Sequence, residues 1–149
     1  MKATGYKAGV AYPIELCSIG SSHSLAKDAA AYFLLMRQAA KESGVDLVVN
    51  SSFRSNESQE RLFTAYVKAM AEFKSGKRPS KPAIAARPGH SNHQSGIALD
   101  INRAPGDDLS TAVPDSPIDK WLNENAKTYG FKRTVPSEPW HWEYDKELL

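Results

Sequence analysis

The sequence predicts an α+β fold, in which a small central antiparallel sheet is flanked by about three helices. Two long stretches in the first half carry apolar residues at helical spacing, and a shorter helix is indicated nearer the end. Residues 97–102 alternate like a buried strand, and residues 131–135 and 140–144 read as an antiparallel hairpin. The chain has 149 residues, 41% of them hydrophobic, so we expect one domain over residues 1–149 with its own core.

Residues 1–23 contain several glycines and are expected to form loops, with one short strand over residues 14–19. Ser24 is the predicted N-cap of a first helix over about residues 25–42, and Gly44 follows its end. The apolar residues of this helix fall on one stripe, which we expect to face the core. They are Leu25, Ala29, Tyr32, Phe33, Met36, Ala39 and Ala40.

Residues 45–53 are rich in β-forming residues and predict a strand that delivers Arg54 to its end. Asn56 and Gln59 have the spacing of a capping box, which predicts a second helix that runs to about Phe73. The apolar side chains of this helix are expected to point inward. They are Leu62, Phe63, Tyr66, Met70 and Phe73.

Two loops separate the remaining elements. Residues 74–88 carry five basic residues and three prolines, and they form either a solvated connection or one border of a substrate groove. A second loop is predicted over residues 105–114. Ser116 then caps a third helix, which runs to about Thr128 and stops at Gly130.

One buried carboxylate needs an explanation. In a strand over residues 97–102, Asp100 lies on the face opposite the aliphatic side chains. An unpaired aspartate in a sheet interior is costly, and a metal, a cation or several hydrogen-bond donors would offset that cost. His93 on the preceding turn supplies a second candidate metal ligand, but catalytic zinc usually takes three protein groups.

The C-terminal strand offers the third ligand. Over residues 140–144 the aromatic residues share one side, so His141 and Glu143 lie on the other. Pro139 predicts a bend or a strand start, which could aim the Glu138 carboxylate toward the face of His141. Such a carboxylate could act as a general base.

Two motifs occur in a fixed order, and further short segments accompany them. The motifs are Ser91-x-His93-x-x-Gly96-x-Ala98-x-Asp100 and, about forty residues later, Glu138-x-x-His141. Together they resemble the paired signature of the LAS-type zinc peptidases, which include VanY-type D-alanyl-D-alanine carboxypeptidases and phage L-alanyl-D-glutamate endolysins. Residues 51–55, Ser-Ser-Phe-Arg-Ser, resemble the family's Gly-Tyr-Arg-Ser segment and extend the resemblance from Ser51 to Tyr144.

The resemblance implies one zinc ion held by His93, Asp100 and His141. Two imidazoles and one carboxylate also suit zinc better than magnesium or calcium, which prefer oxygen ligands. Glu138 would be the general base, taking a proton from water as it attacks a peptide carbonyl and returning it to the leaving amine. Glu143 is the fallback for this role, because it shares the face of His141.

Other residues near the motifs have two interpretations each. Arg54 would stabilise the developing oxyanion or hold a substrate carboxylate, and the alternative is an ordinary salt bridge at the strand end. Ser91 either contacts substrate or caps the turn. His90 lies outside the ligand spacing and is expected behind the ligands or in the loop. Trp140 and Trp142 are expected to anchor the core rather than to form a substrate platform.

The expected function is zinc-dependent hydrolysis of D-alanyl-D-alanine-type bonds in peptidoglycan stem peptides by a metal-activated water. The first alternative is a phage-type L-alanyl-D-glutamate endopeptidase, an endolysin. A second is a zinc-containing recognition module of the same fold without turnover, against which an intact Glu138 argues. A metal nuclease is a third alternative, and a net charge of only +2 argues against nucleic acid as a partner.

Composition also bears on location and assembly. Residues 1–20 contain charged residues and no continuous apolar core, so we expect neither a signal peptide nor a membrane span. We expect a monomer that is made in the cytoplasm and acts on the cell wall or on periplasmic peptidoglycan. The single cysteine, Cys17, is expected to be a buried structural thiol.

Overall fold

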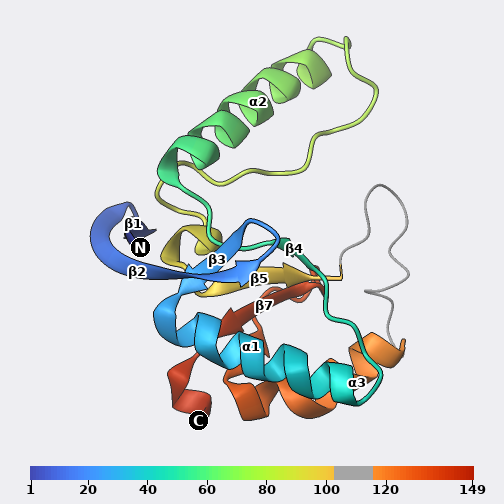
Figure 1. Cartoon of the computed structure of the whole chain (residues 1–149). Helices are drawn as coiled ribbons and strands as arrows, with labels where there is room; N and C mark the ends of the chain where they lie inside the picture. The colour runs from blue at the N-terminus through green and yellow to red at the C-terminus, as the bar shows by residue number, and fades with distance from the viewer. Residues whose placement is uncertain (103–115) are drawn as a thin grey trace.

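The computed structural model describes residues 1–102 and 116–149, which form two antiparallel sheets with helices packed around them (Figure 1). The first sheet has the strand order β1-β2-β3, and the second has the order β4-β5-β7-β6. The α+β class expected from the sequence is confirmed, although only one sheet was expected. The predicted loop over residues 105–114 lies outside the described residues.

The elements have the following bounds. The strands are β1 (Lys2–Lys7), β2 (Val10–Gly20), β3 (His23–Ala26), β4 (Val49–Ser51), β5 (Ala98–Ile101), β6 (Phe131–Arg133) and β7 (His141–Tyr144). The helices are α1 (Lys27–Glu42), α2 (Asn56–Lys74) and α3 (Pro117–Asn125), and the short 3-10 helices are η1 (Asn92–Ser95), η3 (Ala126–Tyr129) and η4 (Lys146–Leu148).

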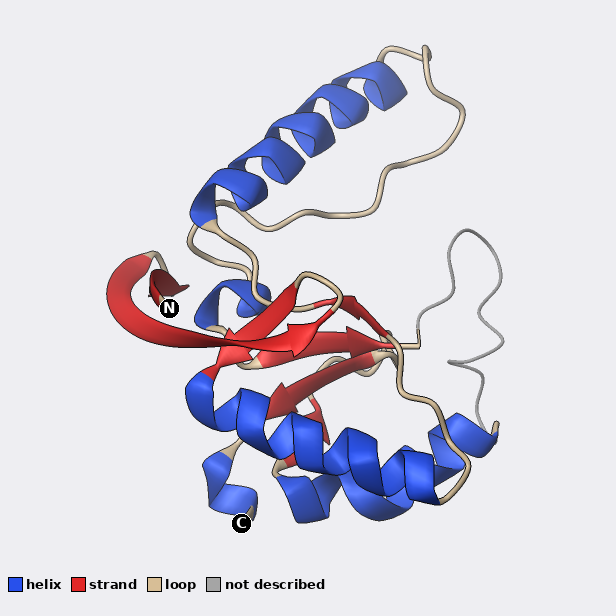
Figure 2. Ribbon diagram, in the orientation of Figure 1, coloured by secondary structure: helices blue, strands red, loops and turns tan. Residues whose placement is uncertain are grey.

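The short strand expected over residues 14–19 is confirmed as part of β2, but the loops expected over the rest of residues 1–23 are wrong, because most of these residues belong to the N-terminal sheet. Strand β2 pairs with β1 along its first part and with β3 along its second, and it curves between the two pairings (Figure 2). Two-residue turns close both hairpins, with φ of 51° and 80° at Ala8 and Gly9 and of 52° and 65° at Ser21 and Ser22. Such turns match the twist of the strands, but alanine and serine rarely adopt these angles and so give little turn signal.

Helix α1 begins at Lys27, so the predicted N-cap at Ser24 is wrong. Ser24 and Leu25 belong to β3, and Ala26 occupies the N-cap position without a side-chain hydrogen bond. The predicted apolar stripe is confirmed along most of the helix. Its buried residues are Ala29, Ala30, Phe33, Met36 and Ala40.

Helix α2 has nearly the predicted length, but it is capped by Ser55, whose hydroxyl accepts from the Ser58 amide at 3.1 Å. The prediction that its apolar side chains point inward is wrong, because Gln59 is its only buried residue and Leu62 is 44% exposed. The helix projects from the body of the molecule, and the chain returns beside it over residues 75–88 (Figure 1). Its apolar stripe therefore faces outside the main core.

The predicted strand over residues 45–53 is confirmed only at β4. Val45 and Leu47 are buried before the strand begins, and they pack in the core without strand pairing. Ser116 caps α3 as predicted, because its hydroxyl accepts from the Asp119 amide at 3.1 Å. The helix continues as η3, and Gly130 ends it with φ of 83°.

The core lies between α1 and one face of the second sheet. Phe33 and Met36 of the helix pack with Leu99 of β5 and Trp142 of β7, and the Phe33 ring meets the Phe131 ring edge-on at a centroid distance of 6.4 Å. Cys17 is half-buried against the same core and forms no disulfide. Within residues 1–102 and 116–149, no helix has the length and apolar composition needed to cross a membrane.

Replacing Phe33, which is 0% exposed, tests this core. We expect Phe33→Ala to lower the free energy of unfolding by about 3–5 kcal/mol, because the change removes the transfer energy of the ring and leaves a cavity. Leu35→Ala is the matched control on the same helix, since Leu35 is 58% exposed. Chemical denaturation of the three proteins measures the difference, and equal losses in both variants would contradict this description of the core.

Candidate functional site

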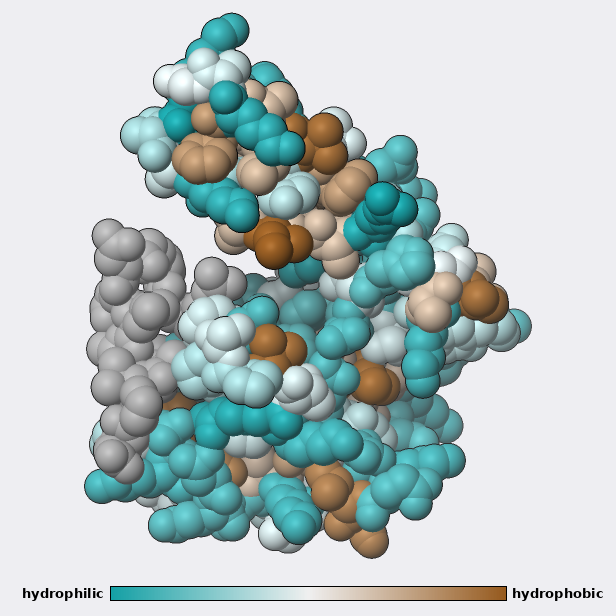
Figure 3. Space-filling view, turned by 180° about the vertical axis from the view of Figure 1, so that it is seen from behind, coloured by the Kyte–Doolittle hydropathy of each residue, from teal (hydrophilic) through white to brown (hydrophobic). Residues whose placement is uncertain are grey.

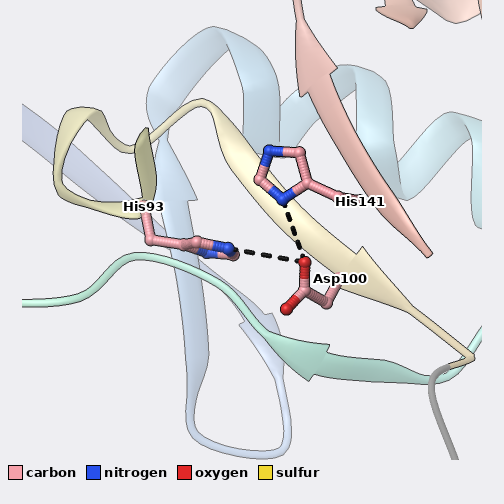
Figure 4. A group of neighbouring side chains, drawn as sticks. All are labelled: His93, Asp100 and His141. Carbon is pink, nitrogen blue, oxygen red and sulfur yellow. Dashed lines mark hydrogen bonds and ion pairs between the residues drawn. The ribbon is translucent and has the colours of Figure 1, made fainter. Parts of the chain in front are cut away.

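The two histidines and the aspartate singled out in the sequence converge in space. His93 comes from η1, Asp100 from β5 and His141 from β7, and all three are buried (Figure 4). One potential ligand atom from each lies within 4.8 Å of the others. Asp100 Oδ1 is 3.4 Å from His93 Nε2 and 3.1 Å from His141 Nδ1.

Local structure explains how the three side chains meet. The antiparallel register of β5 and β7 places Asp100 directly opposite His141. His93 is delivered by a tight 3-10 turn in which Ser91 and Gln94 form a capping box. Gly96 ends that turn with φ of 79°, and a Cβ at this position would lie 3.1 Å from the Ala26 side chain. A glycine is needed there both for the backbone angle and for the close approach.

The hydrogen bond behind His93 sets its protonation pattern. Its Nδ1 lies 3.0 Å from the Ser52 carbonyl oxygen, which can only accept, so Nδ1 carries the hydrogen. Nε2 therefore presents a lone pair toward Asp100. Two imidazoles and a carboxylate at these distances fit a cation with mixed nitrogen and oxygen ligands, and zinc is the ion that such a donor set suits best.

Ionisation of the cluster follows from its burial and its hydrogen bonds. Burial alone would raise the pKa of Asp100, but the hydrogen bond with His141 and the interaction with the nearby His93 ring outweigh it and hold that pKa well below its ordinary value. Burial would lower the pKa of His141, whereas its hydrogen bonds to Asp100 and Glu143 raise it to about 9. Without a metal the cluster thus holds a proton, and metal binding would release it.

The cluster opens into a cavity of about 680 Å³. One wall comes from Leu62 of α2 and from residues 83–86 of the returning segment. This position supports the prediction that the loop over residues 74–88 borders a groove. The other wall includes Val135 and Trp140. Seen from behind, the molecule is hollowed beneath the projecting part that α2 and the returning chain form, and the lower edge of this part carries apolar side chains (Figure 3).

Glu138 lines this cavity together with His141. A turn holds the two residues close, because the His141 amide donates to the Glu138 carbonyl at 3.0 Å. Among residues 1–102 and 116–149, no group hydrogen-bonds the Glu138 carboxylate, so it is available to a ligand. Glu143, the fallback base, is instead held by His141, Asn92 and Thr134 and does not line the cavity.

Arg54 also lines the cavity, close to the cluster. Its amide donates to the His93 carbonyl at 3.0 Å, and its guanidinium donates to Gln59 Oε1 at 3.0 Å and Ser51 Oγ at 3.1 Å. Burial lowers the pKa of Arg54, and the nearby Asp100 charge partly opposes this effect. Within the described part of the chain the guanidinium forms no salt bridge within 4.0 Å, so the strand-end salt bridge is not seen.

The remaining candidates divide between the cavity and the core. Ser91 caps η1 and also lines the cavity, so its two interpretations are compatible. His90 is exposed on the cavity wall. Trp142 is a buried core residue as expected, whereas Trp140 lies in the cavity wall, so its expected core role is wrong. The turn at residues 139–140 explains the difference, because Trp140 precedes β7 and does not share its alternation.

Gln59 is a residue of the site that its sequence context did not reveal. It is 1% exposed, accepts from Arg54 and donates to the Ala86 carbonyl at 2.7 Å, so it joins the arginine to the cavity wall. The Asn56 to Gln59 spacing suggested only a helix cap. A buried polar residue on an otherwise exposed helix can be recognised only once the partner segment is known.

Comparisons with known proteins agree with this arrangement. Residues 22–147 match the model of the family VanY, D-alanyl-D-alanine carboxypeptidase. A D-alanyl-D-alanine carboxypeptidase of Enterococcus faecalis is 30% identical over 149 residues, which cover 89% of this chain and 53% of that protein. The chain spans about half the length of the curated relatives that it matches.

Two solved structures have the same fold. The vancomycin resistance D,D-pentapeptidase VanY, as an E175A mutant in complex with Zn(II), is 28% identical with a TM-score of 0.64, covering 88% of this chain and 78% of its own. The LD-carboxypeptidase LdcB, whose structure concerns peptidoglycan recognition, is 32% identical with a TM-score of 0.65, covering 84% of this chain and 62% of its own. The family match over most of the chain, on a fold that gathers the two motifs at one cavity, shows that the chain belongs to the VanY family of D-alanyl-D-alanine carboxypeptidases.

Proposed function

We propose that this protein is a zinc-dependent peptidase that hydrolyses D-alanyl-D-alanine-type bonds in peptidoglycan stem peptides. The observation that carries the proposal is the convergence of His93, Asp100 and His141 in a cavity that Glu138 and Arg54 also line. Membership of the VanY family supports the reaction class, and the zinc complex of the related D,D-pentapeptidase supports the choice of metal.

Each of the candidate residues has a role in this reaction. Zinc held by the three ligands would supply Lewis acidity and lower the pKa of water to about 7. Glu138 takes a proton from the attacking water and delivers it to the leaving amine, so that no free amide anion is expelled. The ordered turn between Glu138 and His141 keeps base and ligand on the same side of the cavity.

Arg54 suits the recognition of an oxygen that carries negative charge. A guanidinium offers five N–H donors in a fixed fork, and two of its nitrogens already donate to Gln59 and Ser51. These bonds orient the group and leave further donors for the substrate. Arg54 therefore holds either the developing oxyanion or the terminal carboxylate of the substrate.

The alternative substrate bond is L-alanyl-D-glutamate, which a phage-type endolysin would cut. Family membership favours the carboxypeptidase. Because the chain also shares its fold with the LD-carboxypeptidase LdcB, the bond that an LD-carboxypeptidase cuts should be assayed as well. A recognition module without turnover is disfavoured by the Glu138 carboxylate, which lines the cavity with no partner among the described residues. We place the action of the protein on the cell wall, where these peptides occur.

The products of muropeptide digestion distinguish these functions. We expect purified protein to release free D-alanine from pentapeptide stems, to lose this activity with a chelator and to regain it with added zinc, because the proposed ligands must hold the ion. Mass spectrometry of the products provides the measurement. Cleavage between L-alanine and D-glutamate would instead indicate the endolysin, and unchanged muropeptides at all zinc concentrations would contradict the peptidase.

Glu138→Ala tests the general base. We expect turnover to fall by about 10²–10⁴-fold, because the proton transfer loses its acceptor, while zinc content stays at the wild-type level. Glu147→Ala is the control, since Glu147 is exposed and lies near the C-terminus. D-alanine release and metal analysis of each variant provide the measurements. A turnover close to wild type would reject Glu138 as the base.

Arg54→Lys tests the fork geometry rather than the charge. Lysine keeps a positive charge but cannot bond Gln59, Ser51 and substrate together in one plane, so we expect kcat/KM to fall by about 10²-fold or more. Steady-state kinetics with a pentapeptide stem measures the effect. Wild-type kinetics in this variant would show that charge alone suffices.

A further inference from the structure

One carboxylate links three segments of the candidate site. Glu143 Oε2 lies 2.8 Å from His141 Nε2, and it accepts from Asn92 Nδ2 at 2.9 Å and from Thr134 Oγ1 at 2.6 Å. Asn92 precedes the candidate ligand His93 in η1, and Thr134 follows β6 in the segment that leads to Glu138. The Glu143 side chain is 15% exposed and is therefore largely shielded from water.

We infer that Glu143 is a positioning residue for the metal centre, which holds His141 with its hydrogen on Nε2 and so directs the Nδ1 lone pair toward the metal. This inference rests on the proposed zinc site. It assigns to Glu143 a role other than that of a general base, and it makes metal affinity depend on a residue that does not touch the metal.

The hydrogen-bonding capacity of the groups supports this role. A neutral imidazole has one N–H, and the nitrogen without it is the one that can bind a metal. With the hydrogen on Nδ1, His141 would donate to Asp100 Oδ1 at 3.1 Å, and two candidate ligands would be occupied with each other. Glu143 favours the opposite arrangement, because it offers Nε2 an acceptor at 2.8 Å.

The surroundings of Glu143 keep the carboxylate in place. Donors from Asn92 and Thr134 reach the same oxygen that His141 uses, so that oxygen acts only as an acceptor. His141 and Glu143 are two residues apart in β7, and strand alternation puts both side chains on one face. The charge is also complementary, since two neutral imidazoles and one carboxylate around Zn²⁺ leave a net charge of +1 beside Glu143.

Glu143→Gln tests the inference while it keeps the shape of the side chain. Glutamine removes the negative charge and replaces one acceptor oxygen by an NH₂ donor, so it holds the hydrogen on His141 Nε2 less firmly. Mutation of a partner of a metal-binding histidine typically weakens metal affinity by about 10–100-fold, and we expect a rise of that size in the zinc dissociation constant. Competition with a chromophoric chelator measures it without relying on activity. Glu147→Gln is the matched control, because it removes the same charge at an exposed position and should leave the constant unchanged.

A second measurement reads the hydrogen position directly and needs only the wild-type protein. Long-range ¹⁵N–¹H correlation spectra of the zinc-loaded protein should show His141 with its hydrogen on Nε2 and the metal on Nδ1. Thr134→Val, which removes one donor to Glu143 and keeps the carboxylate, should weaken zinc binding less than Glu143→Gln does.

The outcomes separate this inference from the proposed function. Zinc affinity of Glu143→Gln within about threefold of wild type, or zinc on Nε2 of His141, would overturn the positioning role and leave the peptidase proposal intact. Wild-type protein that binds no zinc would overturn both. Wild-type zinc affinity together with full turnover in Glu138→Ala would overturn only the proposed base.

Discussion

The antiparallel pairing of β5 with β7 is the constraint on which the site depends. It places Asp100 opposite His141, although the two residues are 41 positions apart in the chain. A shift of one residue in this register would turn every side chain of one strand to the other face of the sheet. The register is set by the core, because Leu99 and Trp142 must remain buried against α1.

The same two strands therefore provide both stability and chemistry. Their aliphatic and aromatic side chains face the core, while Asp100, His141 and Glu143 face the other side of the sheet. Buried polar groups are costly unless they are paired, and here each candidate ligand has a partner behind it or beside it. The Ser52 carbonyl serves His93, and the Glu143 carboxylate serves His141. The polar network is thus largely buried and held in a fixed orientation on one face of a small sheet.

The cavity wall that α2 contributes is supported differently from the strands that carry the candidate ligands. Helix α2 stands away from the core and is held to the site through Gln59, which joins Arg54 to the returning chain at Ala86. Few apolar contacts fix the rest of this helix, and segments of that kind have lower local stability than a core strand. Leu62 and residues 83–86 thus line the cavity from a part of the chain that is separate from the strands that carry Asp100 and His141.

Local patterns in the sequence determined the candidate ligands, since strand alternation and the bend at Pro139 depend only on neighbouring residues. The cap at Ser116 and the helical stripe of α1 were accessible for the same reason. The N-terminal sheet could not be predicted in this way. The outward position of α2 could not be predicted either, because an amphipathic stripe does not say which surface covers it. Only the tertiary structure decided that Trp140 joins the cavity and that Asn92 and Thr134 hold Glu143 beside His141, because such contacts join different segments of the chain.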